Sequence, residues 1–153
     1  MNKAEHLVIF TLDEQRYALH LSTISRIVHA VEITPLPRAP DIVRGVVNVQ
    51  GQVIPVIDIR RRFQLPQREM QLSDHFIIAS TSRRPVALVA DAVEDVIDYP
   101  EQETVPPDKI LPGTEYIEGV IKLEDGLVII HDLDRFLSLD EDKKLDVALK
   151  KKG

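Results

Sequence analysis

The side chains best suited to chemistry in this 153-residue chain are five histidines. Histidines that bind a metal ion usually recur at short fixed spacings such as HxH or HExxH, because they must face one ion from a single strand or helix. No such spacing occurs here, so we interpret them as scattered surface or half-buried imidazoles and expect no metal site; they are His6, His20, His29, His75 and His131.

Two aspartates, Asp58 and Asp132, each follow an apolar run and precede a short stretch of helical character. A carboxylate in this position typically caps the first free N–H groups of a helix. We therefore predict that each aspartate is the N-cap of the turn that follows it, at 60–63 and at 134–137. This predicts a structural rather than a catalytic role for both.

Motifs for nucleophilic or phosphate chemistry are missing from the sequence. It contains no GxSxG, GxGxxG or P-loop pattern, and it has no cysteine, which excludes disulfides, thiolate metal sites and cysteine nucleophiles. We accordingly expect a protein without catalytic residues and without a cofactor.

Composition narrows the possible partners. Hydrophobic residues make up 44% and charged residues 29%, as in ordinary globular proteins, and the formal net charge is −6. An acidic protein is a poor match for nucleic acid or an anionic membrane. The N-terminal apolar run is too short for a signal peptide, and nowhere is an apolar run long enough to cross a membrane. We expect a cytoplasmic protein that does not insert into a membrane.

The basic triplet Arg60–Arg62 is the strongest local positive charge. We interpret it as a solvated helix face rather than a phosphate clamp. It nevertheless leaves one alternative open, a small acidic β-barrel that binds single-stranded nucleic acid. Such a barrel needs stacking aromatic side chains on its strands, and aromatic residues make up only 5% of this chain.

The stretch Arg44–Phe63, RGVVNVQGQVIPVIDIRRRF, predicts a β-hairpin. β-Branched residues flank the turn Gln50-Gly51 on both sides, and the basic triplet follows as a short helical turn. The segment 45–62 aligns without a gap on 119–136, with Gly45 matched to Gly119. Upstream, the segment Tyr17-Ala18-Leu19 matches Val86-Ala87-Leu88.

This repeat predicts a duplicated unit of two strands, a helical turn, a proline-rich connector and a hairpin. A sheet of so few strands closes most readily into a small barrel. We therefore predict a mainly β fold with a first barrel at about 7–70 and a second at about 75–137. The remaining segment, 138–153, is interpreted either as a docked C-terminal helix or as a solvated charged tail.

Each unit also carries three apolar residues at i, i+3 and i+4 spacing, which favours one helical turn per unit. These turns either line a groove between the barrels or fill the core between them, and the spacing alone does not separate the two. The residues are Ile24, Ile27 and Val28 in the first unit and Val93, Val96 and Ile97 in the second.

Together, three segments resemble the CheW-type chemotaxis coupling proteins: the hairpin stretch, FTLDEQRYALHLSTISRIV before it and VALVADAVEDVI after it. The resemblance covers residues 6 to 137. It implies a CheW-like fold over about 1–145, with two small five-stranded, SH3-like β-barrels, short helical turns and a C-terminal helix.

The resemblance further implies a non-catalytic adaptor that couples the cytoplasmic tips of methyl-accepting chemoreceptors to the regulatory domain of a CheA-like histidine kinase, in membrane-associated receptor arrays. The receptor tip would bind in the groove at the two apolar triplets. The kinase would contact the connector and hairpin of the first barrel, at Ile33, Leu36, Ile42, Val43 and Gly45.

Two positions depart from the pattern of the family. Gln50 stands where members usually carry arginine, and Arg26 stands where they often carry glutamate, so an acid–base pair is replaced by two residues that can share at most a hydrogen bond. This departure raises the alternative of a divergent or accessory chemosensory system in place of a standard flagellar pathway.

Overall fold

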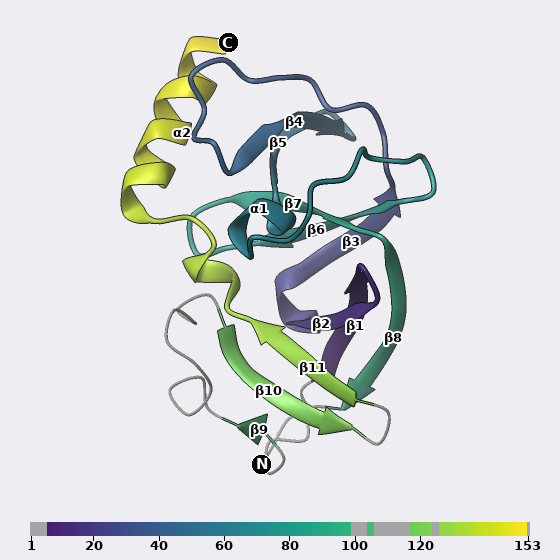
Figure 1. Ribbon diagram of the computed structural model, residues 1–153. Coiled ribbons are helices and arrows are strands. Elements are labelled where there is room, and N and C mark those ends of the chain that lie inside the picture. The colour runs from purple at the N-terminus through teal and green to yellow at the C-terminus, as the bar shows by residue number, and fades with distance from the viewer. Residues whose placement is uncertain (1–5, 99–103, 106–116, 124–125, 153) are drawn as a thin grey trace.

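The computed structural model describes residues 6–98, 104–105, 117–123 and 126–152, with side chains described for 6–98, 117–123 and 126–150. Figure 1 shows two β-sheets stacked along the molecule and one helix beside the upper sheet. The mainly β class and the CheW-like arrangement expected from the sequence are confirmed. Both sheets are open in the described residues, since the first and last strand of each sheet do not pair.

The six-stranded sheet has the order β8-β1-β2-β11-β10-β9. Its strands are β1 (His6–Leu12), β2 (Gln15–His20), β8 (Ala92–Asp98), β9 (Thr104–Val105), β10 (Ile117–Leu123) and β11 (Gly126–His131). The five-stranded sheet has the order β3-β6-β7-β5-β4. Its strands are β3 (Ile24–His29), β4 (Val43–Val49), β5 (Gln52–Ile57), β6 (His75–Ser80) and β7 (Pro85–Ala90).

Each sheet takes strands from both halves of the chain, so the expected division into consecutive barrels at 7–70 and 75–137 is wrong. The hairpin β1–β2 of the first half pairs in parallel with β11 of the second half, and β7 pairs in parallel with β5. The strand that follows each hairpin also joins the other half of the chain. Strand β3, which follows β1–β2, pairs with β6, and strand β8, which follows β6–β7, pairs with β1. The duplicated units are therefore interleaved, and neither half builds a sheet alone.

The hairpin predicted at Arg44–Phe63 is present as β4 and β5 joined by a two-residue turn, with Val49 opposite Gln52. Gln50 and Gly51 have φ values of 50° and 83°, the left-handed conformations of a type I′ turn. The side chain of Asn48 fixes the turn, because its Oδ1 accepts the N–H of Gly51 at 2.9 Å. Local turn chemistry thus sets the register of this hairpin.

The apolar triplets are not helical, and this expectation is wrong. The 3₁₀ turn η1 (Leu21–Thr23) ends before Ile24, and the residues that follow form strand β3. The second triplet lies in strand β8. An i, i+3, i+4 pattern of β-branched residues is compatible with a strand that has one exposed face, and pairing with β6 and with β1 decides the outcome.

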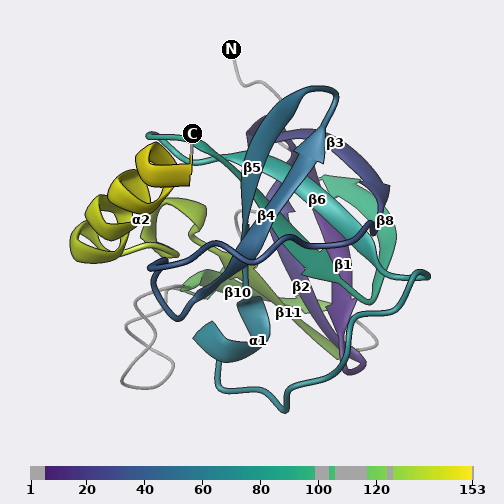
Figure 2. The same ribbon diagram turned by 90° about the horizontal axis from the view of Figure 1, so that it is seen from above.

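The C-terminal segment forms helix α2 (Leu139–Lys152), which packs beside the five-stranded sheet (Figures 1 and 2). Its Leu145 and Ala148 are buried in the largest hydrophobic cluster, together with residues of both sheets. Arginines outside the helix pair with its acidic first turns: Arg62 with Glu141 at 2.6 Å, and Arg84 with Asp142 at 2.8 Å. Of the two possibilities for this segment, the docked helix is the one observed.

Candidate partner-binding surfaces

The two apolar triplets lie on β3 and β8, which are edge strands of different sheets on the same side of the molecule (Figures 1 and 2). Neighbouring residues of a strand point to opposite faces. Accordingly, Val28 and Ile97 pack inward against hydrophobic clusters, while Ile27 and Val96 are 39% and 48% exposed. Each triplet therefore presents one aliphatic side chain to solvent.

The remaining two members of the triplets, Ile24 and Val93, pack against the largest hydrophobic cluster, which contains residues of both sheets. They contribute to the packing between the sheets. Of the two roles left open by the sequence, the structure thus assigns packing to four residues and leaves Ile27 and Val96 as available surface.

The five residues expected at the kinase contact are mostly interior. Leu36, Ile42 and Val43 are buried in the largest hydrophobic cluster, and Ile33 packs against a second cluster. Gly45 is also buried, and a Cβ there would clash with the carbonyl oxygen of Thr34. These residues hold the connector against the hairpin.

The connector is joined to β4 by backbone hydrogen bonds in both directions between Thr34 and Val46, at 2.9 and 2.8 Å. The large aliphatic side chains that this region exposes are Val31 on the connector and Val53 on β5, at 45% and 50%. Sequence reasoning missed both. No alternation along β5 marked Val53, because residues 54–57 that follow it are all buried.

Arg26 and Gln50, the two positions that depart from the family pattern, are both exposed. Arg26 lies on β3 and Gln50 lies in the turn after β4, at opposite edges of the five-stranded sheet. No hydrogen bond joins the two residues in the described part of the chain. The hydrogen bond that the sequence left possible between Arg26 and Gln50 is therefore not formed between these two described residues.

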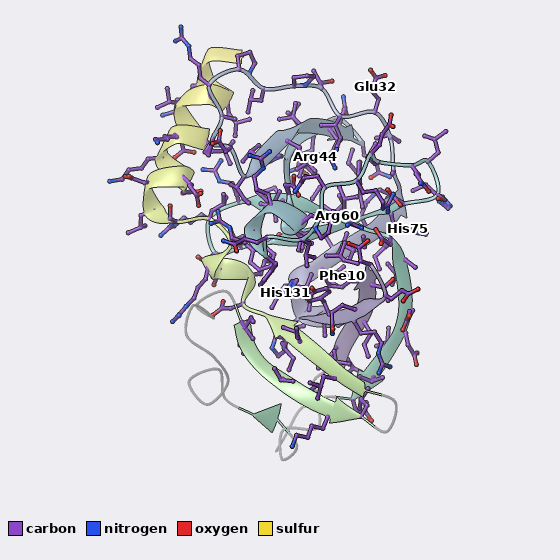
Figure 3. The ribbon with its side chains drawn as sticks, in the orientation of Figure 1. Phe10, Glu32, Arg44, Arg60, His75 and His131 are labelled. Atoms are coloured by element: carbon purple, nitrogen blue, oxygen red, sulfur yellow. The ribbon has the colours of Figure 1, made fainter. Side chains whose placement is uncertain are left out.

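Two members of the basic triplet, Arg60 and Arg62, are paired with carboxylates; Figure 3 shows Arg60 in the interior of the molecule. The guanidinium of Arg60 is buried and donates to Asp13 at 2.6 Å, to Asp91 at 2.9 Å and to the carbonyl of Pro66 at 3.0 Å. Burial alone disfavours its charge, but the hydrogen bonds to Asp13 and Asp91 outweigh burial and raise the pKa of Arg60.

Asp91 is the centre of this cluster. It accepts hydrogen bonds from the backbone N–H of Asp13, from Arg68 and from Arg60. Burial by itself raises the pKa of a carboxyl, but these hydrogen bonds prevail and hold the pKa of Asp91 below its ordinary value. The cluster ties the start of β8 to the β1–β2 turn and to helix α1 (Ile59–Arg62).

Only Arg61 of the triplet matches the expected solvated face, because Arg62 is bound to Glu141 of α2. The pairing neutralises the charge that motivated the nucleic-acid alternative. The carboxylates that bind Arg60 and Arg62 lie far from the triplet in sequence, which explains why local patterns did not identify them.

The two predicted N-caps differ. Asp58 caps α1, since its Oδ1 accepts the N–H of Arg61 at 3.0 Å, and this prediction is confirmed. Asp132 makes no such bond to the 3₁₀ turn η4 (Leu133–Arg135) and lies instead 3.3 Å from the side chain of Arg135. Asp132 thus occupies the predicted N-cap position, but the side-chain hydrogen bond of a cap is missing.

The histidines occupy unrelated environments. His6 and His20 lie 3.2 and 2.7 Å from the carboxylates of Asp98 and Glu118, and the rings of His29 and His75 are 5.1 Å apart. Among the described residues, no group of three or more His, Cys, Asp or Glu side chains is arranged to hold a metal ion.

His131 is the exception to the expected exposure, because it is fully buried among aromatic rings (Figure 3). Its ring centroid lies 4.7–5.6 Å from the centroids of Phe63, Tyr17, Phe136 and Phe10. Neither ring nitrogen has a hydrogen-bond partner. Burial without a compensating charge lowers the pKa of His131 to about 3, so the ring is neutral at neutral pH.

The two interleaved sheets expose single aliphatic side chains on β3, β5 and β8. The family model of the CheW-like domain matches residues 6–141, and the chain belongs to this family. It is 30% identical to the chemotaxis protein CheW of Bacillus subtilis, covering 87% of this chain and 86% of that protein. The CheW of Treponema pallidum is 28% identical over 91% of this chain and 85% of its own length.

One solved structure and a further relative agree with this assignment. The crystal structure of the scaffolding protein TtCheW from Thermoanaerobacter tengcongensis matches with a TM-score of 0.81 and 30% identity, covering 92% of each chain. Protein FrzA of Myxococcus xanthus is 26% identical over 74% of this chain and 71% of its own length. The chain is thus a chemotaxis adaptor of the CheW family, a scaffolding protein rather than an enzyme. None of the described helices is long and apolar enough to cross a membrane.

Proposed function

We propose that this adaptor couples methyl-accepting chemoreceptors to a CheA-like histidine kinase, and that it is recruited from the cytoplasm to receptor arrays. The observation that carries the proposal is membership of the CheW family, on a scaffold that exposes aliphatic side chains on β3 and β8 and at the connector and β4–β5 hairpin. A coupling protein must bind two partners at once, and this requires surfaces that do not overlap.

The receptor surface is centred on Ile27 and Val96, the exposed members of the two triplets. A receptor tip is a helical hairpin, and an apolar helix face packs well against protruding aliphatic side chains. The buried members, such as Val28 and Ile97, would support this surface from behind.

The kinase surface lies around the connector and the β4–β5 hairpin. Because the five residues first expected there are mostly interior, the contact itself would be made by Val31 and Val53, which are exposed. Leu36, Ile42 and Val43 would act indirectly by fixing the connector to the sheet.

The particular system served is proposed to be divergent. Arg26 and Gln50 depart from the acid–base pair that the resemblance implies for the family. The chain is also similar to protein FrzA of Myxococcus xanthus, at 26% identity over 71% of that protein. Exchanging both residues, as Arg26→Glu with Gln50→Arg, should shift partner choice toward standard receptors if this proposal holds.

The test is a reconstitution with vesicle-bound receptor cytoplasmic fragments and a CheA-like kinase. The parent protein should raise kinase autophosphorylation, and Ile27→Asp should reduce receptor co-sedimentation about tenfold by placing a charge in an apolar contact. Leu127→Asp is the matched control, because Leu127 is equally aliphatic and exposed but lies on β11. Equal receptor retention by the Ile27→Asp variant and the parent would show that the receptor surface is wrongly placed.

A further inference from the structure

Helix α2 is held against the five-stranded sheet by a narrow apolar stripe. Among its residues with described side chains, 139–150, the buried apolar ones are Leu145 and Ala148, and Leu149 is half-buried against the same cluster. These three residues follow i, i+3 and i+4 spacing, so they lie on one side of the helix. Because a short helix is stabilised mainly by packing of its apolar face, the docking of α2 depends chiefly on Leu145 and Ala148.

Ion pairs orient the helix on its neighbours. Arg84, just before β7, donates to Asp142 at 2.8 Å and also to Asp146. Arg62, the last residue of α1, binds Glu141 at 2.6 Å. Asp146 is exposed, and an exposed ion pair contributes little to stability. We therefore expect the pairs to fix the position of α2 and the apolar stripe to supply most of its docking free energy.

The connector between β3 and β4, residues 30–42, passes beside α2 in both views (Figures 1 and 2). Its Leu36 and Ile42 are buried in the same hydrophobic cluster as Leu145 and Ala148. The helix and the connector therefore share one core, although they lie about a hundred residues apart in sequence.

The second half of the connector has little backbone pairing of its own. Three of its residues have no N–H to donate, because they are prolines: Pro35, Pro37 and Pro40. The backbone hydrogen bonds seen here are local, since Ala39 donates to the Leu36 carbonyl at 3.4 Å and Val43 donates to the Pro40 carbonyl at 2.9 Å. This segment is positioned by packing of its side chains rather than by strand pairing, so its order depends on what packs against it.

We propose that α2 is a clamp for the connector: packing of Leu145 and Ala148 in the shared core holds residues 35–42 in place, and release of the helix frees them. A freed connector no longer holds Val31 of the kinase surface in a fixed position, and kinase binding weakens. The receptor surface on β3 and β8 lies on the other side of the molecule from α2 and is unaffected (Figures 1 and 2). Only the effect on kinase binding rests on the proposed function; the effect on the connector does not.

The test is amide hydrogen exchange of the full chain, followed by NMR. Leu145→Asp places a charge in a buried apolar site and should release the helix. The amides of Ala39 and Val43 should then exchange at least about tenfold faster, while those of strands β1 and β2 keep their parental rates. Val147→Asp is the matched control, because it puts the same charge at an exposed position of the same helix and should leave the connector unchanged.

Two further variants separate release of α2 from loss of folding. Leu145→Met nearly conserves the side-chain volume and should keep the parental rates at Ala39 and Val43. Leu145→Ala removes the apolar contact without adding a charge. It should accelerate exchange at the same two amides even if Leu145→Asp unfolds the whole protein.

Kinase binding is the second readout. Leu145→Asp should weaken binding of a CheA-like kinase at least about tenfold and leave receptor binding within about twofold of the parent. A parent that binds no such kinase contradicts the proposed function, whereas the exchange rates still decide whether α2 is a clamp. Unchanged kinase binding in a variant with a faster-exchanging connector would remove the predicted effect on the kinase.

Two outcomes would overturn the clamp itself. One is parental exchange at Ala39 and Val43 in a variant whose helix amides have lost protection. The other is acceleration that is equal in the connector and in strands β1 and β2, for both Leu145→Asp and Leu145→Ala.

Discussion

The repeat places two equivalent junctions at the ends of β5 and β11, where Val43 pairs with Ile57 and Ile117 pairs with His131, and their side chains differ. The first is closed by Arg60, which joins carboxylates from the β1–β2 turn and from the start of β8. At the second, the described residues leave a cavity of about 350 Å³ lined by Glu118, Asp132 and Asp134, and the neutral His131 ring is buried among aromatic rings. Strand pairing thus preserves the framework of both junctions, while the charges that fill them have diverged.

The largest expected effect on this comparison comes from removing Asp91, the carboxylate that binds Arg60 at the first junction. Asp91→Ala should lower the free energy of unfolding by about 3 kcal/mol, because Arg60 and Arg68 lose a shared carboxylate in a partly buried site. Urea denaturation measures the effect. Glu94→Ala, which removes an exposed acid of β8, should change stability by less than about 0.5 kcal/mol. Equal effects of the two changes would show that the cluster contributes nothing specific.

The second junction should be sensitive to acid. His131 has a pKa of about 3 in the folded chain and about 6.5 when exposed. Between these pH values the unfolded state binds a proton that the folded state does not bind. The contribution of His131 to the free energy of unfolding is fully present above pH 6.5 and decreases as the pH is lowered toward 3. Between pH 6.5 and 5 the loss should be about 2 kcal/mol.

The repeat supplies the control for this prediction, since Ile57 is the corresponding residue of the first junction and is fully buried. His131→Ile should flatten the loss of stability between pH 6.5 and 5, measured by urea denaturation at each pH. It should also stabilise the protein, because two buried nitrogens without partners disappear. An unchanged pH slope would contradict the assignment of the acid sensitivity to His131.

The smallest expected difference concerns the two aspartates that follow β5 and β11. Asp58→Ala should cost about 1 kcal/mol, because the N–H of Arg61 loses its acceptor. Asp132→Ala should cost less than about 0.5 kcal/mol, since Asp132 makes no side-chain cap hydrogen bond of the kind that Asp58 makes and its pair with Arg135 is solvent-accessible. Thermal unfolding of the two variants gives the comparison, and a larger loss for Asp132→Ala would reverse it.

Much of the fold was accessible from local patterns. The hairpin at 44–63 follows from β-branched residues around a turn that tolerates positive φ, and Asp58 follows from the preference of carboxylates for N-caps. The candidate sites were less accessible. Leu36 and Val43 were expected at a surface but are buried, because burial of an apolar residue depends on what packs against it.

The sequence by itself determined the β class, the internal repeat, the family and the hairpin turn at 50–51, because these are read from residue types and their spacing along the chain. Only the tertiary structure decided that the halves interleave, that the apolar triplets are strands, and that Arg60 is buried. Each of these depends on partners that are distant in sequence, such as Asp13, which binds Arg60 from the turn between β1 and β2. For the same reason, closure of one junction and opening of the other became visible only once both halves were folded together.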